Sequence, residues 1–200
     1  MHSNISIVNV VGGGKLGVQI PLGQLFDELN VEEVEYEPET SPMLKFKINK
    51  HGPTIMLFSS GNYFLAGADS VNEAKETYRN TISKFEQLGM SPINPYFEIR
   101  NIVCKMDFER EFDLSELSVS ISLEHCEFNP DQSPEILCRL PDCAGVFQIF
   151  RTGVVLSTGT KSINELSDDI SLLINKFQEI DLELNDEVVN IVDTKLNLGV

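Results

Sequence analysis

The sequence contains no tryptophan, few histidines and no long apolar run. A membrane-spanning helix needs a stretch of about 18 or more apolar residues, and none occurs in these 200 residues. The first residues also lack the charged start and apolar core of a secretory signal. We therefore expect a soluble, cytoplasmic protein that has no membrane partner.

Residues suited to catalysis or metal binding are also scarce. His2, His51 and His125 do not recur at repeated positions, and Gly12–Gly14 lacks the Lys-Ser/Thr pair of a phosphate-binding loop. The cysteines are Cys104, Cys126, Cys138 and Cys143. Their spacing does not match the paired ligands of a zinc site, so we expect buried free thiols in a reducing compartment. The sequence therefore predicts no enzyme, no metal and no cofactor.

Basic residues are outnumbered two to one. Fifteen Lys and Arg residues face 31 Asp and Glu residues, which gives a formal net charge of −16. This balance argues against a protein that binds nucleic acid through a generally basic surface. Strong acidity is typical of proteins from a salt-rich cytoplasm and of surfaces that bind basic partners. Both interpretations stay open at this stage.

What the sequence does contain is a tandem repeat. Residues 5–88 align without a gap on residues 97–180 at an offset of 92, with 19 of 84 positions identical. The identical pairs include Asn9/Asn101, Pro38/Pro130, Phe58/Phe150, Gly61/Gly153 and Gly67/Gly159. We therefore predict one repeat at 5–90, a second at 96–180 and an acidic tail at 181–200, with a strand-like stretch at 188–192.

Each repeat predicts the same order of elements. An apolar strand comes first (Ile5–Val11; Phe97–Val103), and a short helix follows (Leu22–Leu29; Leu114–Ile121), beginning at Pro21 or Asp113. Strands are then expected at about 33–36, 43–49, 54–59 and 62–66, and again 92 residues later. Ser60-Gly61 and Thr152-Gly153 predict tight turns between the last two strands.

A helix of about eighteen residues closes each repeat. Ser70–Glu73 and Ser162–Glu165 have the spacing of capping boxes, and Gly89 is a natural helix end. Apolar residues at 71, 74, 78, 82, 85 and 88 predict one buried stripe, which the second repeat reproduces. The fold class is therefore α+β, with an antiparallel sheet in each half and helices on one of its faces.

Strand alternation divides the side chains between the two faces of the sheet. The helix-facing set is Val8, Val10, Leu44, Phe46, Ile48, Ile55, Leu57 and Leu65. The opposite set is Asn9, Val11, Lys45, Lys47, Met56, Phe58, Phe64 and Ala66, then Asn101, Val103, Leu137, Arg139, Gln148, Phe150, Leu156 and Thr158. This second set is apolar, weakly basic and free of acids. A bare apolar face predicts a ligand, and a widened DNA minor groove suits it.

The order of these motifs resembles the TATA-binding protein family of archaeal type, over about residues 5–180. The nearest fragments are Glu35–Glu39, Phe58–Gly61 and Asn101–Val103. The resemblance implies two pseudo-symmetric repeats forming a saddle-shaped antiparallel sheet with helices on the convex face. It further implies a nucleoid-associated initiation factor that binds and bends a TATA element in double-stranded DNA, recruiting transcription factor B and, indirectly, RNA polymerase.

The resemblance also implies roles for individual residues. Asn9 and Asn101 would bind base edges beside Val11 and Val103. Lys47 and Arg139 would contact phosphates, and Phe58 and Phe150 would act as kinking wedges. The remaining groove contacts would be Met56, Phe64, Ala66, Gln148, Leu156 and Thr158. Transcription factor B would meet Asn129 and Asp131.

The sequence departs from the family pattern on the DNA side. The family has a second phenylalanine wedge in each half, and Ser41 and Ser133 stand at those positions. The basic residue that the family has after the hairpin glycine is replaced by Asn62 in one half and by Val154 in the other. Two wedges predict a shallower bend or weaker binding than four. The alternative function is a protein-interaction module, a regulator or scaffold, whose sheet binds a protein or a second copy of itself.

Overall fold

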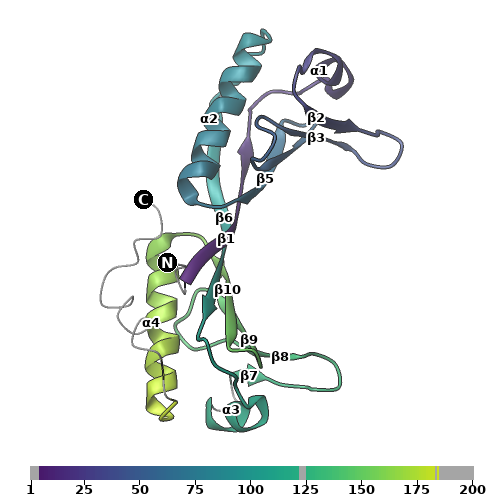
Figure 1. Cartoon of the computed structure of the whole chain (residues 1–200). Helices are drawn as coiled ribbons and strands as arrows, with labels where there is room; N and C mark the ends of the chain where they lie inside the picture. The colour runs from purple at the N-terminus through teal and green to yellow at the C-terminus, as the bar shows by residue number, and fades with distance from the viewer. Residues whose placement is uncertain (1–4, 122–124, 183, 185–200) are drawn as a thin grey trace. The chain divides into compact units, whose positions relative to one another are not determined.

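The computed structural model describes residues 5–121, 125–182 and 184. Most of the predicted acidic tail, including the strand-like stretch at 188–192, lies outside the described residues. The elements, labelled in Figure 1, are β1 (Ile5–Lys15), α1 (Leu22–Glu28), β2 (Glu33–Tyr36), β3 (Met43–Lys47), β4 (Thr54–Phe58), β5 (Asn62–Ala68), α2 (Val71–Gln87), β6 (Tyr96–Asp107), α3 (Leu114–Ile121), β7 (Cys126–Glu127), β8 (Glu135–Cys138), β9 (Val146–Phe150), β10 (Val154–Thr160) and α4 (Ile163–Glu179).

The described strands form an antiparallel sheet in the order β2-β3-β4-β5-β1-β6-β10-β9-β8-β7. The chain divides into two compact units. The N-terminal unit holds Asn9–Arg100, and the C-terminal unit holds Ile5–Val8 together with the described residues from Asn101 onward. The units therefore differ from the sequence repeats, because β1 and β6 each contribute residues to both. The predicted α+β class and the duplicated order of elements are confirmed.

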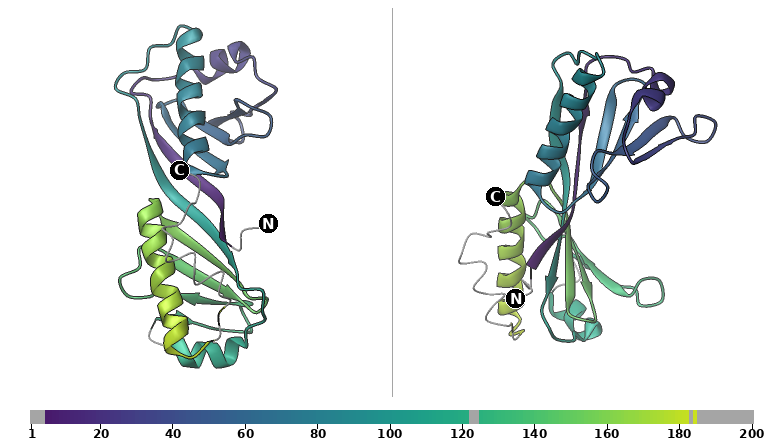
Figure 2. Two further views of the ribbon diagram at one scale, coloured as in Figure 1. Left: turned by 60° about the vertical axis from the view of Figure 1, so that its left-hand side comes forward. Right: turned by 45° about the horizontal axis from the view of Figure 1, so that its top comes forward.

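In each unit a long helix packs along one side of the strands, α2 against β5 and α4 against β10 (Figure 1; Figure 2). Both helices begin at the predicted serine. Ser70 Oγ accepts the Glu73 N–H at 3.0 Å, and Ser162 Oγ accepts the Glu165 N–H at 3.1 Å. Each glutamate accepts a bond in return from the residue before the cap, at 2.7 Å. Both capping boxes are confirmed, except that each glutamate accepts its bond from the residue before the N-cap serine and not from the serine itself.

The buried stripe of the long helices is more polar than predicted. In α2 it contains Thr77 and Thr81, and in α4 it contains Asp169, which is 2% exposed. The two carboxylate oxygens of Asp169 accept the N–H groups of Ala144 and Gly145 at 2.9 and 2.7 Å. Counting apolar residues alone missed these positions. The carboxylate is buried because backbone donors satisfy it, and it thereby anchors the loop between β8 and β9.

The predicted helix-facing core is largely confirmed. Six of its members are at most 1% exposed: Val10, Leu44, Phe46, Ile55, Leu57 and Leu65. Ile48 is only half-buried, since β3 ends one residue earlier. The prediction is wrong for Val8, which is 44% exposed. Val8 is the last residue of β1 before the strand passes from one unit to the other, so simple alternation does not hold there.

The glycine run lies inside β1, whereas the sequence predicted that this strand ends at Val11. Gly12, Gly13 and Gly14 pair with Leu65, Phe64 and Tyr63 of β5, after a bulge that follows Val10. A side chain at Gly12 would overlap the ring of Phe97. The run is therefore a requirement of packing, because the neighbouring strand brings a large ring against the backbone.

That ring belongs to an aromatic stack within the N-terminal unit. Phe97 lies parallel to Tyr78 of α2, with 5.1 Å between ring centroids, and Tyr63 stacks on both. Tyr63 donates its hydroxyl to the Tyr96 carbonyl at 2.9 Å, and burial raises the pKa of this phenol. The equivalent positions in the C-terminal unit hold Ile5, Val155 and Ile170. These side chains are smaller than the aromatic rings, and the position equivalent to Gly12 holds Cys104, which has a side chain.

The expectation of four free thiols is wrong for two of them. Cys126 and Cys138 stand opposite each other on β7 and β8 and form a disulfide. Twelve residues separate them in the chain, so only strand pairing brings them together. Cys104 and Cys143 remain free, and burial raises the pKa of each thiol to about 12. Both therefore stay protonated and poorly nucleophilic at neutral pH.

In the part of the chain that the structure describes, no helix is long and apolar enough to cross a membrane. No group of three or more His, Cys, Asp or Glu side chains is arranged there to hold a metal ion.

The glycine run gives a test of the packing. We expect Gly12→Ala to lower the free energy of unfolding by about 1–3 kcal/mol, because the added methyl overpacks the ring of Phe97. Urea unfolding followed by circular dichroism measures this. Gly23→Ala in α1 is the control, since nothing lies within 4 Å of a side chain there. Phe97→Leu should recover part of the loss when combined with Gly12→Ala. A Gly12→Ala protein as stable as the parent would contradict the packing argument.

Candidate nucleic-acid interface

The residues predicted to oppose the helices do share a face of the sheet in each unit, which we call the open face. In the N-terminal unit Lys45, Met56 and Phe64 are direct ladder partners on β3, β4 and β5. Directly opposed residues of antiparallel strands project to the same side. They are half-buried or exposed, while the alternate positions on these strands are buried. The predicted division between the faces is correct here.

The C-terminal unit repeats this row. Leu137, Gln148 and Leu156 are direct partners on β8, β9 and β10, and Leu156 pairs onward with Lys105 of β6. All of these side chains are half-buried. Gln148 therefore lies between two leucines, at the place that Met56 occupies in the first unit.

Acids also lie on the open face, so the expectation of an acid-free surface is wrong. Glu33 and Glu35 of β2 pair directly with Lys47 and Lys45, and Glu127 of β7 pairs with Leu137. Glu135 stands opposite Phe150. Glu33, Glu35 and Glu127 belong to the edge strands β2 and β7, and Glu135 is the first residue of β8. The predicted set included none of these positions, and the ladder brings their side chains onto the same surface.

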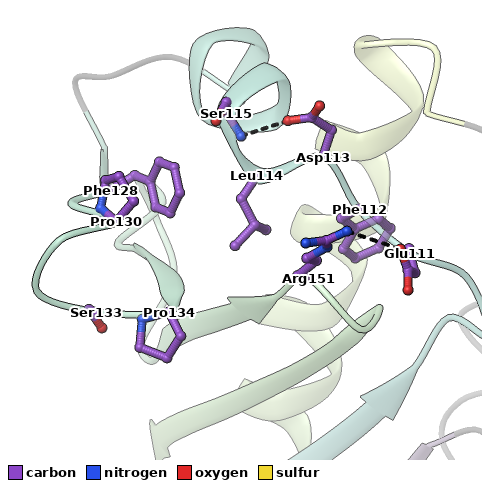
Figure 3. Close-up of a pocket in the computed structure, with 10 residues that line it drawn as sticks. All are labelled: Glu111, Phe112, Asp113, Leu114, Ser115, Phe128, Pro130, Ser133, Pro134 and Arg151. Carbon is purple, nitrogen blue, oxygen red and sulfur yellow. Dashed lines mark hydrogen bonds and ion pairs between the residues drawn. The ribbon is translucent and has the colours of Figure 1, made fainter.

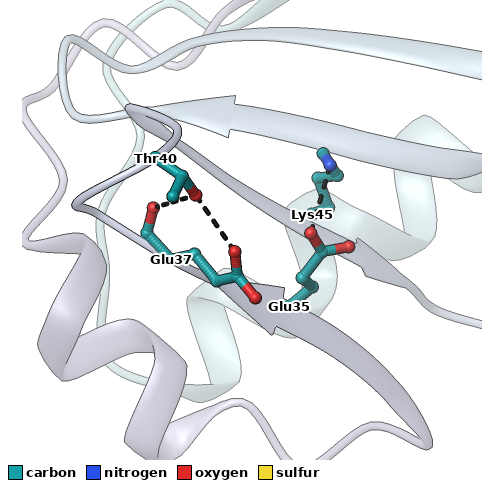
Figure 4. Close-up of polar contacts among 4 residues, drawn as sticks. All are labelled: Glu35, Glu37, Thr40 and Lys45. Atoms are coloured by element: carbon teal, nitrogen blue, oxygen red, sulfur yellow. Dashed lines mark hydrogen bonds and ion pairs between the residues drawn. The ribbon is translucent and has the colours of Figure 1, made fainter.

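Each basic residue among the predicted contacts is matched to one of these acids. Lys47 Nζ lies 2.8 Å from Glu33 Oε2, and Arg139 NH1 lies 3.1 Å from Glu127 Oε1. Lys45 makes the same kind of contact with Glu35 at 3.2 Å, drawn in Figure 4. The hydrogen bond from Lys47 lowers the pKa of the Glu33 carboxyl. The open face is therefore locally neutralised, through exposed pairs that contribute little stability.

The two asparagines are held in the same way in both units. Asn9 Oδ1 accepts the Gly67 N–H at 2.9 Å, and Asn101 Oδ1 accepts the Gly159 N–H at 2.7 Å. Both glycines have a positive φ, of 92° and 109°. The bond identifies the oxygen of each amide, and it leaves the nitrogen as the group that can donate to a ligand. The sequence signal that could have predicted this contact is the identity of Gly67 and Gly159 at equivalent positions of the two repeats.

The two phenylalanines predicted as wedges are half-buried on the open face. The ring of Phe58 meets the edge of Phe64, with 6.2 Å between centroids. Phe150 has Leu156 at the position equivalent to Phe64, and Glu135 opposite it where Phe58 has Met43. The surroundings of the two rings are thus unlike, although both end a strand directly before a hairpin turn. Gly61 and Gly153 form those turns as predicted, with φ of 77° and 82°.

Ser41 and Ser133 occupy matching turns at the loop tips. The N–H of Ser41 donates to the Glu37 carbonyl at 2.9 Å, and the N–H of Ser133 donates to the Asn129 carbonyl at 2.9 Å. In the first loop Thr40 also donates to the Glu37 carboxylate at 3.0 Å (Figure 4). Both loops therefore keep one backbone conformation while lacking an apolar side chain at this position.

The second loop borders a cavity of about 630 Å³ in the C-terminal unit (Figure 3). It is lined by Glu111, Phe112, Asp113, Leu114, Ser115, Phe128, Pro130, Ser133, Pro134 and Arg151. The predicted partner contacts, Asn129 and Asp131, alternate along the loop with two of these residues. Asn129 Oδ1 accepts the Asp131 N–H at 3.3 Å, so the amide braces the turn and leaves Asp131 exposed.

Comparison with known proteins agrees with this arrangement. The family model described as transcription factor TFIID, or TATA-binding protein, matches residues 4–88 and 96–180. TATA-box-binding protein C of Halobacterium salinarum is 27% identical over 178 residues, which cover 88% of this chain and 98% of that protein. The TATA-box-binding protein of Methanocaldococcus jannaschii is 31% identical over 181 residues, which cover 90% of this chain and 97% of that protein.

A solved structure supports the same assignment. The TATA-binding protein of Methanococcus jannaschii superposes with a TM-score of 0.74 at 31% identity, over 88% of this chain and 98% of that one. The repeated strands, the paired asparagines and the wedge positions all fall within the matched residues. The chain therefore belongs to the TATA-binding protein family.

Proposed function

We propose that this protein binds an A/T-rich promoter element through the minor groove, bends it, and recruits transcription factor B and thereby RNA polymerase. The observation that carries the proposal is the pair of asparagine amides, each fixed by a glycine N–H at its oxygen. Proteins of this family are DNA-binding transcription factors and not enzymes, which agrees with the sequence prediction.

The chemistry of the open face suits the floor of that groove. A·T pairs present only acceptors there, adenine N3 and thymine O2, and the free amide nitrogens supply donors. The rows around Met56 and Leu156 supply apolar area for sugars and base edges. Phe58 and Phe150 are placed at strand ends, where a ring can enter between base steps.

Binding to phosphate would require an exchange of partners. Lys47 and Arg139 must leave Glu33 and Glu127 before they can contact DNA. Added salt weakens those exposed pairs and also weakens phosphate contacts. Because the two effects oppose each other, we expect affinity to change little as KCl rises. Such behaviour would suit a salt-rich cytoplasm.

Recruitment of factor B is assigned to the loop of the C-terminal unit. Asp131 is exposed on it, and the adjoining cavity offers the half-buried ring of Phe128 beside the Arg151–Glu111 ion pair at 3.7 Å. A partner with one basic and one apolar group would find a match for each. Replacing Asp131 by Asn should weaken factor B recruitment without changing binding to DNA alone.

One observation favours the alternative of a protein-interaction module. Lys45, Lys47 and Arg139 are all paired with acids, and serines stand at two wedge positions. A face neutralised in this way could bind a protein, or a second copy of the chain, through its apolar rows. Such a regulator or scaffold would show little affinity for DNA.

The two functions are separated by a titration on a fluorescent A/T-rich duplex carrying a donor and an acceptor dye, with and without factor B. Mobility shift reports binding and energy transfer reports bending, from low salt to molar KCl. We expect binding across this range with a shallow bend. A chain that binds no duplex at any salt, yet captures a protein or dimerises, would establish the alternative.

The wedge assignment makes a separate prediction. Phe58→Ala and Phe150→Ala should each reduce the bend, and the double variant should abolish most of it, because the ring that holds a base step open is gone. Energy transfer across the duplex measures this. Phe26→Ala is the matched control, since that ring is 37% exposed on α1, away from the open face. A bend that survives the double variant unchanged would remove the wedge role.

The ion pairs predict a gain of affinity on removal of an acid. Glu33→Gln and Glu127→Gln free Lys47 and Arg139, so we expect each to strengthen DNA binding by about threefold to tenfold at 0.1 M salt. The slope of log K against log salt should steepen by up to about 0.9 for each basic side chain that is released. Glu76→Gln, on the exposed side of α2, makes the same change of charge and should do much less. Equal effects of all three would mean that net charge, and not the pairing, governs affinity.

A further inference from the structure

The two asparagine sites differ in one neighbour. In the C-terminal unit Thr158 Oγ1 lies 3.2 Å from Asn101 Nδ2 and 3.3 Å from Asn101 Oδ1. The equivalent neighbour of Asn9 is Ala66, which has no polar side-chain atom. Asn9 keeps only the bond from Gly67 among the described residues. Two sites with the same backbone and the same amide therefore present different chemistry.

The hydroxyl of Thr158 adds a hydrogen-bond acceptor that the methyl group of Ala66 cannot provide. A threonine hydroxyl has one hydrogen to donate and two lone pairs to accept. When Thr158 donates to Asn101 Oδ1, its lone pairs remain available to a ligand, and Asn101 Nδ2 remains a donor beside them. The C-terminal site can thus offer a donor and an acceptor together, whereas the N-terminal site offers a donor beside a methyl group.

The minor groove contains a group that distinguishes these two sites. A·T pairs show only acceptors, while a G·C pair adds the guanine N2 amino group, which is a donor. Against Ala66 that amino group would be desolvated with no acceptor. Against Thr158 it can donate to the hydroxyl oxygen. A buried donor left without a partner costs enough for roughly a tenfold loss of affinity.

We propose that Thr158 makes the protein read the two halves of its DNA element differently, so that the C-terminal site tolerates a G·C pair and the N-terminal site, with Ala66, rejects it. This inference rests on the proposed function. It implies that an element with G·C on one side orients the bound protein.

A palindromic A/T duplex tests this, because the protein can bind it in either direction. The A·T pairs nearest the dyad are replaced by G·C on one side or on both, and Kd is measured by fluorescence anisotropy. One G·C pair should weaken binding only about twofold, since the protein turns its Thr158 half toward it and loses one of two orientations. Two should weaken it about tenfold or more, because Ala66 must meet one of them.

Inosine isolates the responsible group. An I·C pair lacks the N2 amino group, so its minor groove resembles that of A·T. Two I·C pairs should therefore bind nearly as well as the parent duplex. A penalty from I·C as large as that from G·C would overturn the inference, since the amino group would then not be what is read.

Two variants assign the effect to residues. Thr158→Val keeps the shape and removes the hydroxyl, so a single G·C pair should now cost about tenfold. Ala66→Thr supplies the missing hydroxyl, so two G·C pairs should cost no more than about threefold. Each variant is compared with its own affinity for the parent A/T duplex, and circular dichroism reports that it is folded.

The outcomes separate this inference from the function on which it rests. Failure to bind the unsubstituted duplex would overturn the proposed function itself. If the protein binds the unsubstituted duplex normally, and the fold-loss of affinity from two G·C pairs is the square of the fold-loss from one, the two halves read DNA alike. That result would overturn this inference alone. Unchanged tolerance of one G·C pair in Thr158→Val would do the same.

Discussion

Antiparallel pairing is the constraint on which the rest of the structure depends. Because partners across the ladder project to one side, burying Leu44, Ile55 and Leu65 against the helices forces Lys45, Met56 and Phe64 onto the other side. The apolar character of that open face is thus partly a consequence of covering the opposite one. The same rule brings the edge acids beside the bases, so the face acquires its charge pattern and its apolar rows together.

The two repeats share a backbone arrangement but differ in many of their side chains. Both units place an asparagine oxygen on a glycine N–H, and both begin their long helices with the same capping box. Around these shared points the contents differ. An aromatic stack with glycines in one unit corresponds to aliphatic residues and Cys104 in the other, and Ala66 corresponds to Thr158. Symmetry of the fold therefore supplies two similar sites, and substitutions within it make them chemically distinct.

Charge is arranged locally in a chain whose net charge is −16. On the open face the bases are neutralised by acids from the edge strands, while Asp169 is satisfied by backbone N–H groups inside the protein. A polyanion approaching this face meets bases that are already engaged. On the proposal that this face binds DNA, binding is an exchange of partners, and affinity depends on the strength of the short surface ion pairs more than on the overall charge.

The order of elements, both capping boxes, the hairpin glycines and most of the core could be predicted from the sequence, because each depends on local spacing that a repeat shows twice. The candidate contacts on the open face followed from strand alternation and resemblance. Tertiary structure alone decided the Cys126–Cys138 bridge, the burial of Gly12 against Phe97, the exposure of Val8 and the pairing of Lys47 with Glu33. Each of these needs the register between strands or the point where β1 changes unit, and neither is written in local periodicity.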